Sequence, residues 1–348
     1  MHDMKCDRTP HSHARSHSIA SFAMRALIDV GANLCDERFR GIYHDRARHA
    51  SDLEFVLARA RDARVERIII TCGSLGEAKE GLKLAREMSS SSSSSSSKRA
   101  PALSTTVGVH PTRCDEFGSD ARSVDAHVGE LLALARDGMR DGVVVAIGEC
   151  GLDYVRDEFC SRAVQREMFE RQFALAEATS LPMFLHMRGA ASDFIEILSR
   201  NRHRFTKCVV HSFDGTADEA KAILAIAEGR VFIGINGCSL RSSANVDVAR
   251  SIPLSRVVLE TDSPWCSIKP SHASYDAIDL PREIFTKPRR YDAYVSGAIV
   301  KDRNEPAFAL AVAQCVARAK GIDLDVVCDV TTANARAVFW PRDVSETT

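Results

Sequence analysis

The chain has 348 residues, of which 45% are hydrophobic and 27% are charged, and its 46 Lys and Arg residues nearly balance its 47 Asp and Glu residues. This composition is typical of a globular protein, and the balanced charge excludes a surface that is basic throughout and coats a nucleic acid by electrostatics alone. We expect no contact with a membrane, because no apolar run approaches the ~18–20 residues that cross a bilayer.

Residues 1–23 precede the first apolar run and are rich in His, Ser and Arg. They contain no apolar core of a secretory signal, and Asp3 and Asp7 disfavour a mitochondrial presequence. We therefore predict a disordered extension at 1–23, a folded domain at 24–342 and a short C-terminal tail at 343–348. A cytoplasmic or nuclear location is expected, and a mitochondrial one is the alternative.

Eleven cysteines are scattered along the chain without a C-x-x-C pair. This spacing argues against a disulfide framework and against a structural zinc site, and it fits a reducing compartment. We expect most of the cysteines to act as small buried apolar groups.

Eight short runs of apolar and β-branched residues alternate with amphipathic stretches from residue 26 onward. This alternation predicts βα units around a parallel sheet. The predicted strands are 26–31, 67–71, 104–109, 143–148, 182–185, 207–210, 231–235 and 257–261. Eight repeats are the number that closes a TIM-type (β/α)8 barrel, so we predict that fold. An open doubly wound sheet is the alternative, but no G-x-G-x-x-G turn follows the first strand.

Helical patterns lie between the strands, and a run of serines interrupts the series. The predicted helices include 52–64, 163–179, 217–227 and 244–251. Nine consecutive serines at 89–97, followed by Lys98 and Arg99, cannot bury enough apolar area to offset the entropy lost on ordering. We therefore predict a flexible surface loop at 89–101.

An irregular segment at 263–303 follows the eighth strand. It contains four prolines and the basic cluster Lys287, Arg289 and Arg290. A loop of this length inside a compact domain is usually functional or disordered. Helical patterns at 305–320 and 324–338 come next and complete the domain.

Polar side chains stand at the ends of five predicted strands. Glu149, His186, His211 and Asp262 follow strands four, five, six and eight, and His110 follows strand three. The strands of such a barrel bring their carboxyl ends to one face, so these side chains are expected to meet in one cavity. Two imidazoles and two carboxylates form a mixed ligand set that suits Mg²⁺, Mn²⁺ or Zn²⁺. One such residue alone is often just a satisfied polar group or a helix N-cap, but four together favour a metal site.

Longer motifs surround these residues. They are V-G-V-H-P at 107–111, I-G-E-C-G-L-D-Y at 147–154, P-M-F-L-H at 182–186, V-H-S-F-D-G at 210–215, I-G-I-N-G-C-S at 233–239, E-T-D-S-P-W at 260–265, R-N-E-P at 303–306 and N-A-R-A-V-F at 334–339. Together they resemble the TatD family of metal-dependent deoxyribonucleases, a (β/α)8 barrel family among the amidohydrolase-like metal hydrolases. Two further motifs, F-R-G-I-Y at 39–43 and H-P-T-R-C at 110–114, are most similar to its eukaryotic branch.

The resemblance implies hydrolysis of DNA phosphodiester bonds, commonly from a 3′ end, in DNA repair or DNA degradation. It implies one or two divalent ions, with Glu149 as a bridging ligand, His186 and His211 on one ion, and Asp262 on the other. Many relatives begin with D-x-H-x-H, but the corresponding run at 29–33 has neither histidine. The ion is therefore expected to be held more weakly than in a full site, which Mg²⁺ or Mn²⁺ tolerates better than Zn²⁺.

Four further residues are candidates for contacts with the substrate. His110 is expected to contact a phosphate or to act as an acid, and a structural role is the alternative. Arg113 and Arg188 stand beside the motifs and are expected to bind phosphate, unless they are simply solvated. Trp265 is expected either to stack on a base or to pack inside the loop.

Two other functions stay open at this point. The same metal site could hydrolyse an amide or an ester, as in deacylases on related barrels, or the missing first-strand histidines could leave a binding protein without catalysis. A nuclease assay with and without a chelator, a screen of acyl substrates and a metal analysis would distinguish the three. We expect a monomer.

Overall fold

The computed structural model describes residues 25–91, 100–118 and 123–341. The predicted extension at 1–23 and the predicted tail at 343–348 lie outside these residues, and so do residues 92–99 of the predicted serine loop. Among the residues that the structure describes, no helix is long and apolar enough to cross a membrane.

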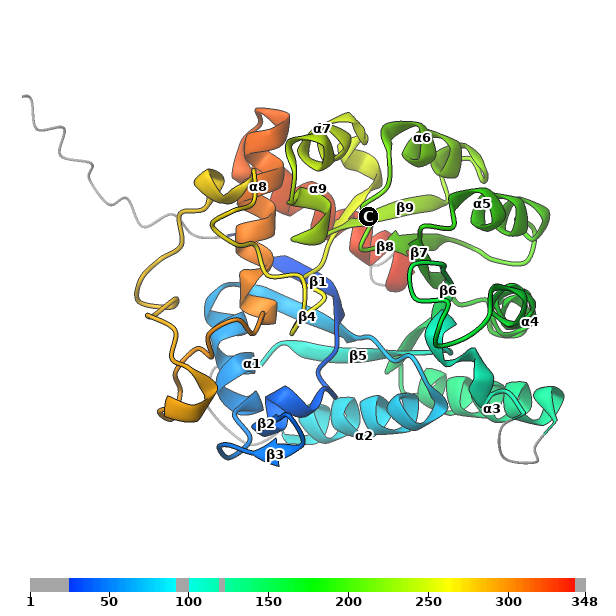
Figure 1. Ribbon diagram of the computed structural model, residues 1–348, viewed down its shortest axis with the longest axis horizontal. Coiled ribbons are helices and arrows are strands. Elements are labelled where there is room, and N and C mark those ends of the chain that lie inside the picture. The colour runs from blue at the N-terminus through cyan, green and yellow to red at the C-terminus, as the bar shows by residue number, and fades with distance from the viewer. Residues whose placement is uncertain (1–24, 92–99, 119–122, 342–348) are drawn as a thin grey trace, which may run out of the picture.

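Eight parallel strands form one curled sheet with helices around it (Figure 1), and their order around the sheet is their order in the chain. Their bounds are β1 Leu27–Ala32, β4 Val65–Ile70, β5 Ala102–Val107, β6 Val144–Asp153, β7 Met183–Arg188, β8 Cys208–His211, β9 Val231–Ile235 and β10 Val257–Leu259. The two ends of the sheet are joined by a parallel bridge between Ala32, the last residue of β1, and Ser263, which lies beyond β10. There the Asp262 N–H also donates to the Gly31 carbonyl at 2.8 Å. The predicted (β/α)8 barrel is confirmed.

Helices pack around the outside of the sheet. In the described residues the α-helices are α1 Leu53–Asp62, α2 Leu75–Ser91, α3 Val124–Arg140, α4 Arg162–Thr179, α5 Ala191–Arg200, α6 Ala217–Ala225, α7 Ser243–Ser251, α8 Ala309–Lys320 and α9 Leu324–Phe339. Neighbouring helices share buried aromatic residues: Phe169 of α4 stacks on Phe194 of α5, with ring centroids 5.5 Å apart. Helix α4, which the sequence predicted at 163–179, therefore buries its apolar face, with Phe169 against α5.

A short antiparallel hairpin, which the sequence did not predict, follows β1. Its strands are β2 Ile42–Tyr43 and β3 Arg46–Ala47, too short to produce a recognisable alternation. The irregular segment at 263–303 packs against this hairpin, because Tyr291 stacks on Tyr43 with ring centroids 4.5 Å apart. The long segment after β10 is thus anchored beside the first βα connection.

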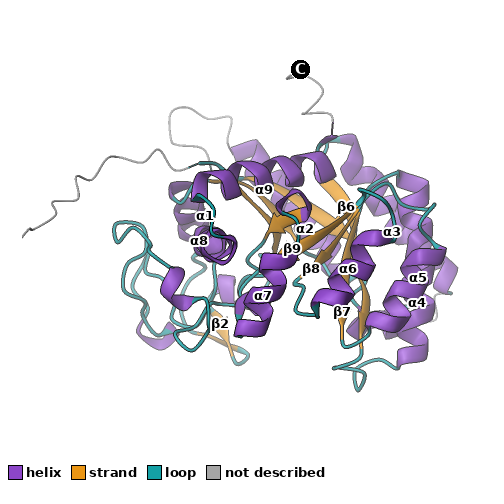
Figure 2. Cartoon of the chain, turned by 90° about the horizontal axis from the view of Figure 1, so that it is seen from above, coloured by secondary structure: helices purple, strands orange, loops and turns teal. Residues whose placement is uncertain are grey.

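The inside of the barrel is filled by apolar side chains. Ile69, Phe184 and Phe232 form one buried cluster there, which includes Val338 and Phe339 of α9. Figure 2 shows α9 lying across the end of the strands opposite the β2 hairpin. Because α9 and the packed interior close that end, the carboxyl ends of the strands are the face on which a pocket can form.

Strand β6 is longer than predicted. The prediction ended the strand at residue 148, but β6 runs through Glu149 to Asp153. Gly148 and Gly151, with φ values of 141° and 147°, let β6 approach β7 closely. A Cβ at Gly151 would lie only 1.9 Å from the carbonyl oxygen of His186, its partner in the ladder. The strand therefore continues because glycine removes the side chains that would separate it from β7.

Residues 89–91, which were predicted as the start of the serine loop, belong to α2, because this helix continues through Ser91. The Ser89 hydroxyl donates to the Ala85 carbonyl at 2.9 Å, and the Ser90 hydroxyl donates to the Glu87 carbonyl at 2.9 Å. These side-chain bonds accompany the last turn of the helix, although serine is a poor helix former. Residues 89–91 of the predicted loop are thus helical.

Candidate metal centre and active site

A pocket of about 420 Å³ lies among the carboxyl ends of the barrel strands and the loops that follow them. All eight candidate residues from the sequence line it: His110, Arg113, Glu149, His186, Arg188, His211, Asp262 and Trp265. His211 is the last residue of β8, whereas Glu149 and His186 lie inside β6 and β7. Residues from strands far apart in the sequence therefore meet in one cavity, as the barrel predicted.

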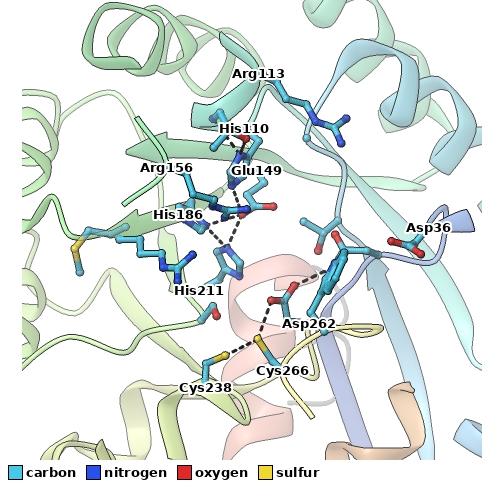
Figure 3. A pocket seen from close by; sticks show the side chains of 18 of the residues that line it. Asp36, His110, Arg113, Glu149, Arg156, His186, His211, Cys238, Asp262 and Cys266 are labelled. Atoms are coloured by element: carbon cyan, nitrogen blue, oxygen red, sulfur yellow. Dashed lines mark hydrogen bonds and ion pairs between the residues drawn. The ribbon is translucent and has the colours of Figure 1, made fainter. Parts of the chain in front are cut away.

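Glu149, His186 and His211 form a buried cluster at the centre of this pocket (Figure 3). The Oε1 atom of Glu149 lies 2.8 Å from Nδ1 of His186 and 2.7 Å from Nε2 of His211. The two ring nitrogens are 3.1 Å apart. One carboxylate oxygen and two imidazole nitrogens are thus close enough together to bind a single ion.

Each of the two histidines also faces a second carboxylate. The Nε2 atom of His186 lies 3.5 Å from Asp153, and the Nδ1 atom of His211 lies 3.7 Å from Glu260. Glu260 is fully buried and is held by the Ser212 N–H at 2.5 Å. Carboxylates placed behind metal-binding histidines fix the orientation of the ring and increase its basicity.

Sequence analysis missed Asp153 and Glu260 as members of the site. A signal for Asp153 was present, because it lies four residues after Glu149 and alternate residues of a strand share a face. The premature end assigned to β6 concealed it. Glu260 lies two residues before Asp262 in a run assigned to strand eight, and nothing local distinguishes it from a solvated acid.

Charges inside the buried cluster shift the pKa values of its three members. Burial alone would raise the pKa of Glu149, but the charges of His211 and His110 and hydrogen bonds from both clustered histidines outweigh it and hold that pKa well below its ordinary value. Burial would likewise lower the pKa of His211, but Glu149 and Glu260 raise it well above its ordinary value. The pKa of His186 is raised as well, against its burial, by Asp153 and Glu149.

The neighbouring carboxylates thus favour positive charge at the ring nitrogens of both histidines. A divalent cation satisfies the same anions and takes the ring nitrogens as ligands, in exchange for protons. The donor set of nitrogen and oxygen atoms, with no thiolate in the cluster, fits Mg²⁺, Mn²⁺ or Zn²⁺. The residues present therefore fit the divalent ion that the sequence predicted.

Asp262 lies on the other side of Glu149 from His110 (Figure 3). Its Oδ1 accepts a hydrogen bond from the Asn33 side-chain amide at 2.9 Å, and its Oδ2 accepts one from the Cys266 thiol at 3.2 Å. Burial raises its pKa to about 6. Asp262 thus faces the pocket, but it stands outside the close cluster that Glu149 forms with the two histidines.

The first strand has little room for an imidazole at Gly31, the position of the first histidine in the D-x-H-x-H pattern. A Cβ at Gly31 would lie 3.0 Å from the Phe184 ring and 3.1 Å from Glu260, so an imidazole does not fit without displacement. Asn33, at the second of the two positions, instead donates to Asp262. This side of the pocket offers oxygen atoms and an amide in place of imidazoles.

His110 has a structural contact and also lies in the pocket, so it has features of both roles that the sequence left open. Its Nδ1 accepts a hydrogen bond from the Thr112 N–H as the N-cap of the short 3-10 helix η2, Pro111–Glu116. Its Nε2 lies 3.4 Å from Glu149, and burial lowers its pKa to about 3. His110 also forms a second possible ion-binding group with Asp153 and His186. It therefore combines a capping role with a place in the pocket.

Arginines surround the pocket, and two of them were not singled out from the sequence. Arg113 is paired with Glu77 at 2.5 Å, and Arg188 ends β7. Arg156 and Arg241 line the same pocket. Guanidinium groups at the rim of a pocket are suited to phosphate, because their fork of donors matches two phosphate oxygens.

Trp265 is exposed at the rim, so it does not pack inside the loop, which was one of the two interpretations of this residue. Its side chain is 53% exposed, and the Arg38 guanidinium lies over its ring at 3.4 Å from the centroid. Asp36 holds that guanidinium through two hydrogen bonds of 2.9 and 3.0 Å. The indole is thus supported on one face by a fixed cation while it lines the pocket.

The comparisons with known proteins agree with this geometry. A family model described as TatD related DNase matches residues 28–340. The chain is 36% identical to "Deoxyribonuclease Tat-D" of Schizosaccharomyces pombe over 88% of this chain and 93% of that protein. It is 33% identical to "3'-5' ssDNA/RNA exonuclease TatD" of Erwinia tasmaniensis, over 90% and 99% of the two chains. A solved hydrolase of the TatD family from Entamoeba histolytica is similar in structure, with a TM-score of 0.81, 31% identity and coverage of 91% and 99%.

Proposed function

The chain belongs to the TatD family of deoxyribonucleases, hydrolases of phosphodiester bonds, and from this membership we propose that it removes nucleotides from the 3′ end of DNA with the help of divalent metal ions. The exonuclease mode follows the name of the bacterial relatives, and a role in DNA degradation or DNA repair follows from the activity. The expected monomeric state and the expected location remain predictions.

One observation carries this proposal: two imidazole nitrogens converge on a single oxygen of Glu149 at the centre of the pocket. A carboxylate between two histidines is a ligand set for a divalent cation. When bound, that cation supplies Lewis acidity to a phosphoryl oxygen and activates a water molecule. We assign Glu149, His186 and His211 as the residues that hold it.

Asp262 has a second role in the proposal. Its carboxylate faces the same pocket, and its pKa of about 6 lets it take up a proton near neutral pH. Asp262 would therefore orient the attacking water or hold a second ion beside Asn33. The oxygen-rich surroundings on this side favour Mg²⁺ or Mn²⁺ over Zn²⁺.

The rim of the pocket supports a strand end as the substrate. Arg113, Arg156, Arg188 and Arg241 line it, and we propose that they bind the backbone phosphates. We propose that His110 contacts the phosphate that reacts. At about 420 Å³ the pocket has the size of a small-ligand site, ~300–1,000 Å³, which fits the end of a single strand better than the side of a duplex.

A nuclease assay with purified protein tests the proposal. Single-stranded DNA labelled at its 5′ end should shorten stepwise from the 3′ end when Mg²⁺ or Mn²⁺ is added, and a chelator should stop the reaction. The Glu149→Gln variant, which keeps the shape of the side chain but loses its charge, should lose at least ~100-fold in rate. The Glu158→Gln variant is the matched control, because Glu158 is exposed and does not line the pocket.

Three results would count against the proposal. Stepwise shortening that persists in Glu149→Gln would remove the assigned site. Hydrolysis of acyl substrates without any cleavage of DNA would favour the amide or ester hydrolase. Absence of bound metal together with absence of both activities would favour a binding protein without catalysis.

A further inference from the structure

Two cysteines face each other at the edge of the pocket. Cys238 begins the 3-10 helix η3, Cys238–Leu240, after β9, and Cys266 lies beyond β10. Their sulfur atoms are 2.7 Å apart, and both residues line the pocket. Figure 3 shows the pair below Asp262. Two thiols that are separated by 28 positions in the sequence are thus in direct contact beside the active site.

The backbone around the pair keeps the two segments together. A Cβ at Gly237 would lie 2.0 Å from the Cys266 carbonyl oxygen, so the two chains touch at the residue before Cys238. The Cys238 N–H donates to the Asn236 side chain at 2.8 Å, which fixes the start of η3. A disulfide requires Cβ atoms about 3.5–4.5 Å apart, and such an approach is available only where two backbones pack this closely.

The pair is also connected to a residue of the proposed active site. The Cys266 thiol donates to Oδ2 of Asp262 at 3.2 Å, and the Arg241 guanidinium lies 3.4 Å from the Cys238 sulfur. A change at either sulfur therefore alters the hydrogen bonding of Asp262 and the position of a rim arginine. Cys266 also follows Trp265, whose indole lines the same pocket.

Most other cysteines in the described residues are less exposed than Cys238 and Cys266. Seven of them, among them Cys114 and Cys160, are buried, whereas Cys238 and Cys266 are half-buried at a pocket that solvent can enter. Susceptibility of a thiol to oxidation depends on access by the oxidant as well as on a resolving partner. Cys35 lines the same pocket and serves as a comparison for access.

We propose that Cys238 and Cys266 are a reversible oxidation site, which hydrogen peroxide converts to a disulfide that lowers the activity of the enzyme. One thiol gives up two electrons to the peroxide, forming a sulfenic acid and releasing one water. The second sulfur then attacks the first, the S–S bond forms and the S–O bond breaks, and a second water leaves. In total two thiols and one peroxide become one disulfide and two waters.

The disulfide removes the S–H donor from Asp262 and ties η3 to the segment that carries Trp265. Both changes act on the pocket and leave the cluster of Glu149 with its histidines in place. The effect on activity rests on the proposed nuclease function, but formation of the bond does not. The chemical bond and the enzymatic effect are therefore measured separately.

The first measurement is made on the full chain without any activity assay. Protein treated with hydrogen peroxide in the presence of a chelator, and protein kept in dithiothreitol, are alkylated and digested, and the linked peptides are identified by mass spectrometry. A peptide that links Cys238 to Cys266 is expected in the oxidised sample and not in the reduced one. If both cysteines are instead alkylated fully after treatment, the proposal is wrong, whatever the protein does to DNA.

The second measurement is DNA hydrolysis after the peroxide and the chelator are removed and metal is restored. The oxidised wild type should lose several-fold in rate and recover in dithiothreitol. The Cys238→Ser variant should show no loss that dithiothreitol reverses, whereas Cys35→Ser and Cys114→Ser should respond as the wild type does. The effect on activity would be overturned if Cys238→Ser lost as much reversible activity as the wild type does. It would also be overturned if the wild type formed the Cys238–Cys266 disulfide and its rate of DNA hydrolysis did not change. A protein that forms the link but never cleaves DNA would contradict the proposed function and leave the oxidation site standing.

Discussion

The Nδ1 atom of His186 and the Nε2 atom of His211 lie 3.1 Å apart in the centre of the barrel mouth. Two buried imidazoles at this distance repel each other whenever both are protonated. They stay together because Glu149 lies between them and because Asp153 and Glu260 stand behind them. This arrangement of three acids around two histidines fits a set of metal ligands with supporting groups.

The acids behind the histidines should affect metal affinity without being ligands. Replacing Glu260 by Gln removes the charge that faces Nδ1 of His211, and the affinity for Mn²⁺ should fall by about 10- to 100-fold. Electron paramagnetic resonance of free Mn²⁺ measures this affinity directly. Glu219→Gln, in the first turn of α6 and not in the lining of the pocket, should leave it unchanged. Equal affinities for the wild type and Glu260→Gln would show that Glu260 only fills space.

Metal binding should weaken as the pH falls. The pKa values of His186 and His211 are raised in the metal-free protein, so protons occupy the ring nitrogens at and above the ordinary titration range of histidine. Protons therefore compete with the cation, and affinity rises with pH until both rings are neutral. Calorimetry in buffers of different ionisation enthalpy should show release of protons on binding. Binding that is independent of pH between about 5.5 and 8 would contradict this assignment.

Asp29 should make the fold less stable as the pH rises. It is fully buried and accepts hydrogen bonds from the Thr261 side chain and from the N–H groups of Thr261 and Gly31. Burial raises its pKa from 3.8 to about 8. Because the folded state binds the proton more tightly than the unfolded state does, this contribution is fully present below pH ~4 and is lost as the pH rises to about 8.

The Asp29→Asn variant carries no ionisable group at this position, so it should not lose this part of its stability as the pH rises. Urea denaturation at pH 5 and pH 8.5 gives the free energy of unfolding for both proteins. The wild type should lose more stability than the variant between the two pH values, by an amount on the order of a few kcal/mol. Parallel pH profiles would show that Asp29 is not protonated in the folded protein.

Trp265 should bind a base of the substrate. Its indole is exposed at the rim, with the Arg38 guanidinium on its ring. Stacking of a base is worth ~1–3 kcal/mol, so Trp265→Ala should raise the KM for single-stranded DNA by roughly 5- to 150-fold. Hydrolysis of bis(p-nitrophenyl) phosphate, which has no base, should be affected much less.

Two variants serve as controls for this experiment. Trp265→Phe keeps an aromatic face and should recover part of the affinity. Phe159→Ala removes another exposed aromatic side chain, one that does not line the pocket, and should leave the KM unchanged. Equal losses on DNA and on bis(p-nitrophenyl) phosphate would mean that Trp265 supports the pocket and does not bind a base.

The barrel and the central residues of the site could be predicted from the sequence because their signals are local. Alternation of apolar runs with helical patterns predicts the βα units, and eight such units are the number that closes the barrel. Once the strands are known, Glu149, His186 and His211 must meet, because every strand ends at the same face. Asp262 reaches the pocket for the same reason.

Tertiary structure decided what the histidines face and what the pocket exposes. Asp153 joins the site only because β6 continues past Glu149, and that depends on how closely Gly151 approaches β7. The contact of Cys238 with Cys266 depends on the packing of two loops that are far apart in the sequence. Such contacts are set by distances between strands and loops, and these distances arise only when the whole chain is packed.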